Sequence, residues 1–322
     1  MEKIYNNIRE FPKQFLWKPE IVNAENLPQT GLDAKITICG MGGSALAGDF
    51  IKTWLERTAI TIHRDFGIPQ NIAPDFVVTI SYSGNTEETL SSFHEAREKK
   101  LPLLGIASGG ALEKECLKHK IPFIKLPQGF QPREAMGFMV KALGAILAPD
   151  KIKELEDTGT ILTESLEPFG KELAEKIVGK IPLIYTSPRM GVLGYNWKIR
   201  LNETGKTPAF VGIIPELFHN EMTGFDMGKK VSALKEKFFF VLLEDSEDTA
   251  AHQARFDAFE TFFSTKGFLL KHIRTEKSNF CRGFFSSVSL ADWTAYYLAK
   301  ISGANPEEVL WVEEFKALVR KH

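Results

Sequence analysis

The residues best suited to chemistry form a hydroxyl-rich turn, Ser-Tyr-Ser-Gly-Asn-Thr, at positions 81–86. The turn follows an apolar run at 76–80, which predicts a buried strand, and leads into 86–99, which predicts a helix. Backbone N–H groups and hydroxyls converge in such a turn, and the helix macrodipole adds partial positive charge there. The turn has no lysine and no P-loop pattern, which favours a small phosphate ester over a nucleoside triphosphate. The side chains expected to bind the phosphate are Ser81, Ser83 and Thr86.

A second loop, Gly-Met-Gly-Gly-Ser-Ala at positions 40–45, follows the first predicted strand and begins a helix. It also fits the G-x-G-x-x-A dinucleotide fingerprint, and Asp65 stands near the place of a ribose-binding acid, so an oxidoreductase is an alternative. A Rossmann domain does not need a second anion turn, whereas two loops at the carboxyl ends of parallel strands suit one compact sugar phosphate. A further alternative is that both loops are simple tight turns. The sugar-phosphate interpretation adds Gly42, Gly43 and Ser44 to the expected binding residues.

Composition and charge narrow the class of protein. The 322 residues are enough for two domains, and a hydrophobic content of 43% supports full cores. A formal charge of −1 gives no reason to expect binding to nucleic acid or to an anionic membrane. No apolar run approaches a membrane span, the N-terminus lacks a signal-peptide core, and the three cysteines form no CxxC pair. We therefore expect a cytoplasmic protein that needs neither a cofactor nor a metal.

Strand and helix patterns alternate along both halves of the chain. Strands are expected at 35–39, 59–63, 76–80, 101–106, 122–126, 182–186, 237–243 and 268–273. Helices are expected at 44–57, 86–99, 110–119, 133–148, 151–178, 191–201, 249–265, 288–302 and 307–320. This rhythm predicts two α/β domains, residues 1–150 and 151–322, each with a parallel sheet between helices. The second half has no copy of the 81–86 turn, so only the first domain is expected to bind the phosphate.

The two loops, GMGGSALAGD and SYSGNTEET, resemble those of the sugar isomerase (SIS) domain. Over nearly its full length the chain resembles, more narrowly, the bifunctional phosphoglucose/phosphomannose isomerase family. The motifs that carry this resemblance in the rest of the chain are Gln131-Pro132-Arg133, Asn202-Glu203, His219-Asn220-Glu221 and Lys316 in the last helix. The resemblance implies two SIS-type domains with doubly wound parallel sheets, and an aldose–ketose isomerase of a hexose 6-phosphate.

The resemblance also implies a role for each of four residues. Isomerisation needs a base that moves a proton between C1 and C2, help in opening the sugar ring, and positive charge for the enediolate. By resemblance Glu203 is the base, and His219 opens the ring from the partner subunit of a homodimer. Arg133 stabilises the enediolate, and Lys316 lies near the ring oxygen. Without the resemblance, each would more simply be a surface residue or, for Arg133, half of a salt bridge.

The remaining histidines have no comparable setting and are interpreted as structural or surface residues: His63, His94, His119, His252, His272 and His322. One departure from the family pattern concerns Val309, which stands where relatives carry a threonine linked to accepting both epimers. Loss of that hydroxyl weakens the expectation of mannose 6-phosphate activity more than that of glucose 6-phosphate activity.

The resemblance therefore implies an enzyme that interconverts glucose 6-phosphate and fructose 6-phosphate through an enediolate. Mannose 6-phosphate is expected as a second aldose substrate. Two alternatives stay open. One is a non-catalytic SIS module that only binds a sugar phosphate, and the other is a SIS isomerase of a different sugar phosphate.

Overall fold

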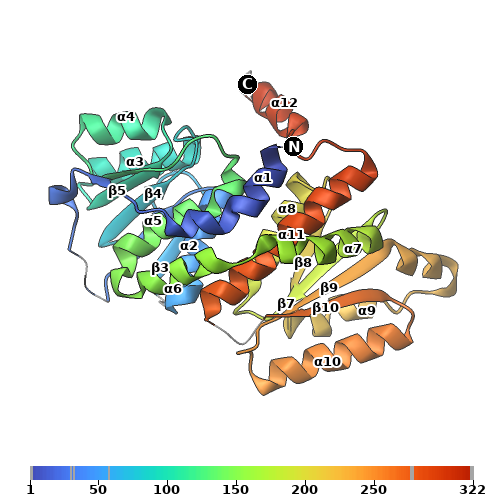
Figure 1. Cartoon of the computed structure of the whole chain (residues 1–322). Helices are drawn as coiled ribbons and strands as arrows, with labels where there is room; N and C mark the ends of the chain where they lie inside the picture. The colour runs from blue at the N-terminus through green and yellow to red at the C-terminus, as the bar shows by residue number, and fades with distance from the viewer. Residues whose placement is uncertain (1–2, 30, 32, 57–58, 276–278, 320–322) are drawn as a thin grey trace. The chain divides into compact units, whose positions relative to one another are not determined.

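The computed structural model describes residues 3–29, 31, 33–56, 59–275 and 279–319. Arg57, Arg320 and His322, which appear in the expectations above, lie outside these residues. The chain forms two compact units (Figure 1). The N-terminal unit comprises residues 10–161 and 279–282, and the C-terminal unit comprises the described residues within 1–9, 162–278 and 283–322.

The N-terminal unit contains a six-stranded sheet in the order β1-β6-β5-β4-β2-β3. Its strands are β1 (Ile21–Val22), β2 (Ile36–Cys39), β3 (Ile60–His63), β4 (Phe76–Ile80), β5 (Leu103–Ala107) and β6 (Phe123–Lys125). Only β1 runs antiparallel to its neighbour; the other pairs are parallel. The chain passes from β2 outward to β3 and then crosses to the other side of β2 to form β4. The switch point, where ligands bind in such sheets, therefore lies at the carboxyl ends of β2 and β4.

Helices cover both faces of this sheet (Figure 1). They are α2 (Gly42–Leu55), α3 (Glu87–Glu98), α4 (Gly110–Lys118), α5 (Met136–Leu147) and α6 (Ile152–Glu156). On one face α2 packs on α5, and on the other α3 packs on α4. A Cβ at Gly48 would lie 2.9 Å from the Ile62 side chain, so glycine lets α2 approach the sheet closely. This close approach holds the start of α2, and with it the glycine loop, at the sheet edge.

The C-terminal unit contains a four-stranded parallel sheet in the order β10-β9-β7-β8. Its strands are β7 (Ile181–Thr186), β8 (Phe210–Ile213), β9 (Phe238–Glu244) and β10 (Leu269–Arg274). Its helices are α1 (Lys3–Glu10), α7 (Glu167–Ile177), α8 (Gly191–Glu203), α9 (Glu221–Gly224), α10 (Ala250–Thr265), α11 (Phe280–Ser302) and α12 (Leu310–Val319), the first turn of α11 belonging to the N-terminal unit. The chain reverses direction across this sheet between β7 and β9, so this unit is doubly wound as well.

Short 3-10 helices connect these elements: η1 (Phe11–Leu16), η2 (Ala24–Asn26), η3 (Pro132–Glu134), η4 (Pro149–Lys151), η5 (Asp157–Thr160), η6 (Thr163–Ser165), η7 (Glu216–His219) and η8 (Lys229–Lys237). Side-chain alternation along β9 separates the two faces of the sheet. Phe240 and Leu242 join an aromatic core with Phe256, Phe259 and Phe263 of α10, whereas α8 packs on β7 and β8.

The predicted fold class is confirmed, and most strands lie within one or two residues of their expected bounds. The largest differences are in the helices and one strand. The expected helix at 151–178 is several short segments, because Gly159 and Pro168 interrupt the chain. β8 was not expected, since a strand of four residues containing Gly212 resembles a loop in sequence. Among the described residues, no helix has the length and apolarity required to cross a membrane.

Candidate active site

The two predicted phosphate loops meet at the switch point of the N-terminal unit. Ser44, in the first turn of α2, accepts a hydrogen bond of 3.1 Å at its Oγ from the backbone N–H of Tyr82. The backbone N–H of Gly40 reaches the carbonyl of His63, and a Cβ at Gly40 would lie 2.7 Å from the carbonyl oxygen of Ile80. Glycine is therefore required where the end of β2 passes the end of β4. No acidic side chain lies in the first turn of α2, so nothing there offsets its positive dipole end.

The 81–86 turn is organised by its own hydroxyls. Ser81 Oγ lies 2.9 Å from Thr86 Oγ1 and accepts a 3.1 Å hydrogen bond from the N–H of Gly84. Ser83 Oγ lies 3.5 Å from Ser81 Oγ and accepts a 3.3 Å hydrogen bond from the N–H of Asn85. Ser81 is buried, whereas Ser83 is exposed. Thr86 is the N-cap residue of α3, but its hydroxyl makes no cap hydrogen bond and instead contacts Ser81. Three hydroxyls are thus held within reach of one small anion.

A third loop, which follows β5, packs against the 81–86 turn and forms a hydrogen bond with it. Gly84 has φ of 68°, and a Cβ there would lie 1.8 Å from the carbonyl oxygen of Gly109. The side chain of Asn85 accepts a 2.9 Å hydrogen bond from the N–H of Ala111. Any side chain at Gly84 would therefore clash with the backbone of Gly109 and displace the 81–86 turn from the loop after β5.

Arg133 lies beside the glycine loop although ninety residues separate them in sequence. A Cβ at Gly43 would lie 3.2 Å from the carbonyl oxygen of Pro132 and 3.5 Å from Cα of Arg133. The 3-10 helix η3 begins with a capping box formed by Gln131 and Glu134, which fixes the backbone on both sides of Arg133. Arg133 is 6% exposed. The N-terminal unit thus gathers seven of the predicted site residues at one sheet edge: Gly42, Gly43, Ser44, Ser81, Ser83, Thr86 and Arg133.

Glu203, the last residue of α8, lines a groove of about 860 Å³ in the C-terminal unit. Glu308 and Val309 line the same groove, together with apolar side chains such as Phe210. Lys206 Nζ donates to the carbonyl oxygens of Glu203, at 2.6 Å, and of Glu308. Asn202 accepts a 2.8 Å hydrogen bond from the N–H of Ala209, which fixes the segment after the helix. Glu203, the predicted base, and Val309, which differs from the threonine of the family pattern, therefore line the same groove.

His219 ends η7 and is exposed. The residues around it are anchored: Asn220 donates to Glu216 at 3.2 Å, and Glu221 accepts a 3.1 Å hydrogen bond from the hydroxyl of Tyr185. Burial and the neighbouring Glu221 carboxylate raise the pKa of Tyr185, so its hydroxyl stays a donor. The imidazole is therefore presented outward by a fixed backbone.

Lys316 is on α12, whose described residues are all exposed, and forms an ion pair of 3.0 Å with Glu313. Neither Lys316 nor His219 lines the groove that contains Glu203. The groove therefore brings neither His219 nor Lys316 together with Glu203.

Sequence reasoning missed the structural importance of Tyr82. Its hydroxyl donates to the carbonyl of Pro127 at 2.8 Å and accepts from the N–H of Phe130 at 3.0 Å, while its carbonyl accepts from Ser108 at 2.6 Å. Burial raises the pKa of the Tyr82 phenol, so it remains neutral. Tyr82 joins the two phosphate loops to the segment that leads into η3. The available signal was an aromatic residue inside an otherwise small, polar turn.

Among solved structures, the chain shares its fold with sugar-phosphate isomerases. The tagatose-6-phosphate ketose/aldose isomerase from Escherichia coli matches with a TM-score of 0.72 and 15% identity, over 95% of each chain. The chain thus has the fold of these sugar isomerases, with the two predicted phosphate loops at the switch point of its first sheet.

Sequence comparison identifies the family. The model of the bacterial phospho-glucose isomerase C-terminal SIS domain matches residues 168–319. A bifunctional phosphoglucose/phosphomannose isomerase from Aquifex aeolicus is 34% identical over the whole of both chains. This chain belongs to the bifunctional phosphoglucose/phosphomannose isomerase family. Another relative, the D-glucosamine-6-phosphate 4-epimerase of Sulfolobus acidocaldarius, is 28% identical over 69% of this chain and 72% of its own length.

Family membership confirms the resemblance inferred from the motifs and the expectation that the protein is an isomerase. It removes the dinucleotide alternative for the glycine loop. The carboxylate of Asp65, the residue that supported that alternative, accepts a 2.8 Å hydrogen bond from the N–H of Phe66 in its own loop. The roles of the individual site residues stay predictions.

Proposed function

We propose that this protein interconverts glucose 6-phosphate and fructose 6-phosphate through an enediolate, with mannose 6-phosphate as a poorer second aldose. The observation that carries the proposal is the hydrogen bond from Tyr82 to Ser44, which joins the two predicted phosphate loops at the switch point. Similarity to a phosphoglucose/phosphomannose isomerase over the full length of both chains supports it.

In this proposal the phosphate group binds Ser44, Ser81, Ser83 and Thr86 together with the nearby backbone N–H groups. His219 assists ring opening by exchanging a proton with the ring oxygen or the C1 hydroxyl. Glu203 then takes the proton from C2 of the open aldose and returns it to C1, which gives the ketose.

Positive charge completes the proposed site. Arg133 stabilises the enediolate oxygens, and its nearly complete burial beside the glycine loop reduces the screening of its charge by water. Lys316 contributes near the ring oxygen. No step in this scheme calls for a cofactor.

We propose a homodimer in which His219 is supplied by the partner subunit. The exposed position of the histidine on an anchored segment is compatible with that arrangement. Mixing inactive Glu203→Gln protein with inactive His219→Ala protein tests it. Subunit exchange should restore up to about half of the activity per heterodimer, because one of the two sites then carries neither change. If the subunits exchange and no activity returns, His219 does not cross the interface.

We place the protein in the cytoplasm. Its three cysteines, Cys39, Cys116 and Cys281, are buried and free. Burial raises the pKa of Cys39 and Cys116 to about 12, so these thiols are poor nucleophiles. Free thiols in the core accord with a reducing compartment.

The decisive experiment is a panel of sugar phosphates with the purified protein. Fructose 6-phosphate should yield glucose 6-phosphate, detected by a coupled dehydrogenase. The 4-epimerase relative makes glucosamine 6-phosphate the most informative alternative substrate. Turnover of glucosamine 6-phosphate alone would assign the protein to that second function, and binding without turnover of any hexose 6-phosphate would make it a sensor.

A further inference from the structure

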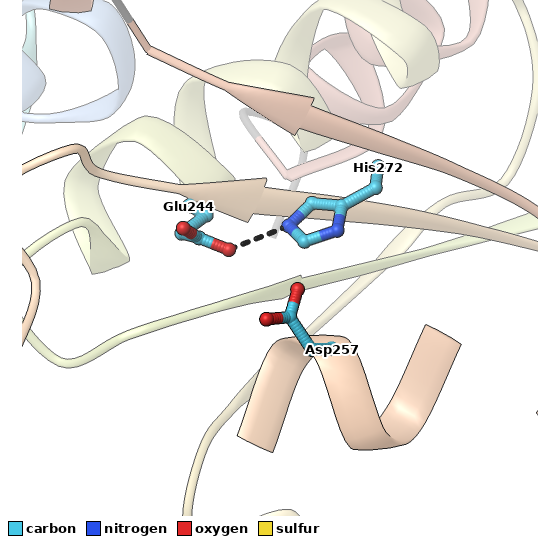
Figure 2. Close-up of side chains that lie close together, drawn as sticks. All are labelled: Glu244, Asp257 and His272. Atoms are coloured by element: carbon cyan, nitrogen blue, oxygen red, sulfur yellow. Dashed lines mark ion pairs between the residues drawn. The ribbon is translucent and has the colours of Figure 1, made fainter. Parts of the chain in front are cut away.

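Three ligand-type side chains meet on the C-terminal unit, where β9, β10 and α10 pack together (Figure 2). Glu244 is the last residue of β9, His272 is on the adjacent β10, and Asp257 is on α10. One ligand atom from each of the three lies within 4.8 Å of the others. Figure 2 shows the Asp257 carboxylate directed toward the space between the imidazole and Glu244. None of these residues belongs to the proposed catalytic set.

The imidazole of His272 is held in the orientation that metal-binding histidines adopt. Its side chain is only 4% exposed, and its Nδ1 lies 2.7 Å from Glu260 Oε2. A histidine that binds a metal through one nitrogen usually donates its other N–H to a carboxylate in this way. In the neutral tautomer that donates from Nδ1 to Glu260, Nε2 has a lone pair facing the cluster.

The environment of Nε2 favours a positive charge. It lies 2.8 Å from Glu244 Oε2, yet it is one of the buried side-chain atoms without a hydrogen-bond partner in the described part of the chain. The two observations agree if the separation is short but the direction does not suit a hydrogen bond. A lone pair facing a carboxylate at this distance is repulsive, and either a proton on Nε2 or a bound cation removes that repulsion.

Within the described residues, the cations that contact these carboxylates do not balance their charge. The three carboxylates of Glu244, Asp257 and Glu260 face one imidazole and one guanidinium, that of Arg274. Arg274 Nε lies 3.3 Å from Glu244 Oε2, and its Nη2 contacts Asp257. Among these five groups, negative charge is in excess whether the imidazole is neutral or protonated. The Arg274 side chain is 52% exposed, so its guanidinium can move into solvent and release Glu244 and Asp257.

We propose that Glu244, Asp257 and His272 form a binding site for a divalent transition-metal ion, for which Arg274 competes. Two carboxylate oxygens and one imidazole nitrogen suit Zn²⁺ or Mn²⁺. Ligand atoms around a tetrahedral ion are about 3.4 Å apart for bonds of about 2.1 Å, so Nε2 and Glu244 Oε2, which lie 2.8 Å apart, have to separate slightly on binding. The ion would join β9, β10 and α10, and its role would be structural rather than catalytic.

The test is metal binding by the full-length protein after chelator treatment and dialysis. Titration calorimetry with ZnCl₂ and MnCl₂ should give one site per chain, and each metal should raise the melting temperature. Asp257→Asn, His272→Gln and Glu260→Gln should each weaken binding by about tenfold or more. Because the Asp257 side chain is 63% exposed, Asp257→Asn should fold normally. With Co²⁺, the visible absorption spectrum should change in His272→Gln.

Two variants separate this proposal from adventitious binding. Arg274→Gln removes the competitor and should strengthen metal binding severalfold, whereas loss of a merely structural ion pair would leave affinity unchanged. His252→Gln, on the first turn of α10, is the matched control and should bind as the parent does. The proposal is overturned if no stoichiometric site is found, if Arg274→Gln does not strengthen binding, or if His252→Gln weakens it as much as His272→Gln.

Discussion

Replacing Tyr82 with phenylalanine tests whether one phenol holds the predicted phosphate loops to the segment before Arg133. The change removes a hydrogen bond of 2.8 Å to the Pro127 carbonyl and one of 3.0 Å from the Phe130 N–H. Each is worth about 0.5–1.5 kcal/mol net, so the pair sets a range of about 1–3 kcal/mol. Residues 127–130 are partly exposed, and water can replace the lost partners in part. We therefore expect a loss of unfolding free energy of about 1.5 kcal/mol, in the lower half of that range.

Urea unfolding of the parent and of Tyr82→Phe, followed by circular dichroism, measures this loss. Tyr195→Phe is the matched control, since Tyr195 is 40% exposed on α8, and its effect should stay within about 0.5 kcal/mol. The Tyr82 backbone N–H still reaches Ser44 in the variant, so sugar-phosphate binding should weaken but persist. A change as small as that of the control would refute the view that this hydroxyl organises the loops.

Three further predictions concern ligand binding and catalysis. Ser83→Ala combined with Thr86→Ala should weaken fructose 6-phosphate binding by roughly 1.5–3 kcal/mol for each charge-assisted hydrogen bond lost, and unchanged affinity in calorimetry would exclude these hydroxyls. Glu203→Gln should lower kcat by about a hundredfold or more with similar KM, and Glu308→Gln in the same groove is the control. Near-normal turnover by Glu203→Gln would rule out Glu203 as the base. The parent should prefer glucose 6-phosphate to mannose 6-phosphate in kcat/KM, and Val309→Thr should narrow the gap by about 1 kcal/mol. Equal rates on both epimers in the parent would contradict the role given to Val309.

The sequence alone determined the features that depend on neighbouring residues. The apolar run at 76–80 is by itself sufficient to predict a buried strand, and the hydroxyl turn at 81–86 is sufficient to predict a loop that binds an anion. The order of such elements along the chain predicted a parallel sheet between helices, and the structure has β4 at the expected bounds. Segments with weaker local signals were missed, as β8 was, because pairing with β7 rather than local propensity makes it a strand.

Only the tertiary structure decided which distant residues meet. The hydrogen bond from Tyr82 to Ser44 arises because β2 and β4 are parallel neighbours, and the close approach of Gly43 to Arg133 arises because η3 packs on α2. No periodicity in the sequence records either contact. His272 was interpreted from sequence as a structural or surface residue, since its partners Glu244 and Asp257 lie at no motif spacing. Parallel pairing of β9 with β10, and the packing of α10 on both, bring those side chains within 4.8 Å. Such sites form through contacts between residues far apart in the chain, and those contacts exist only after folding.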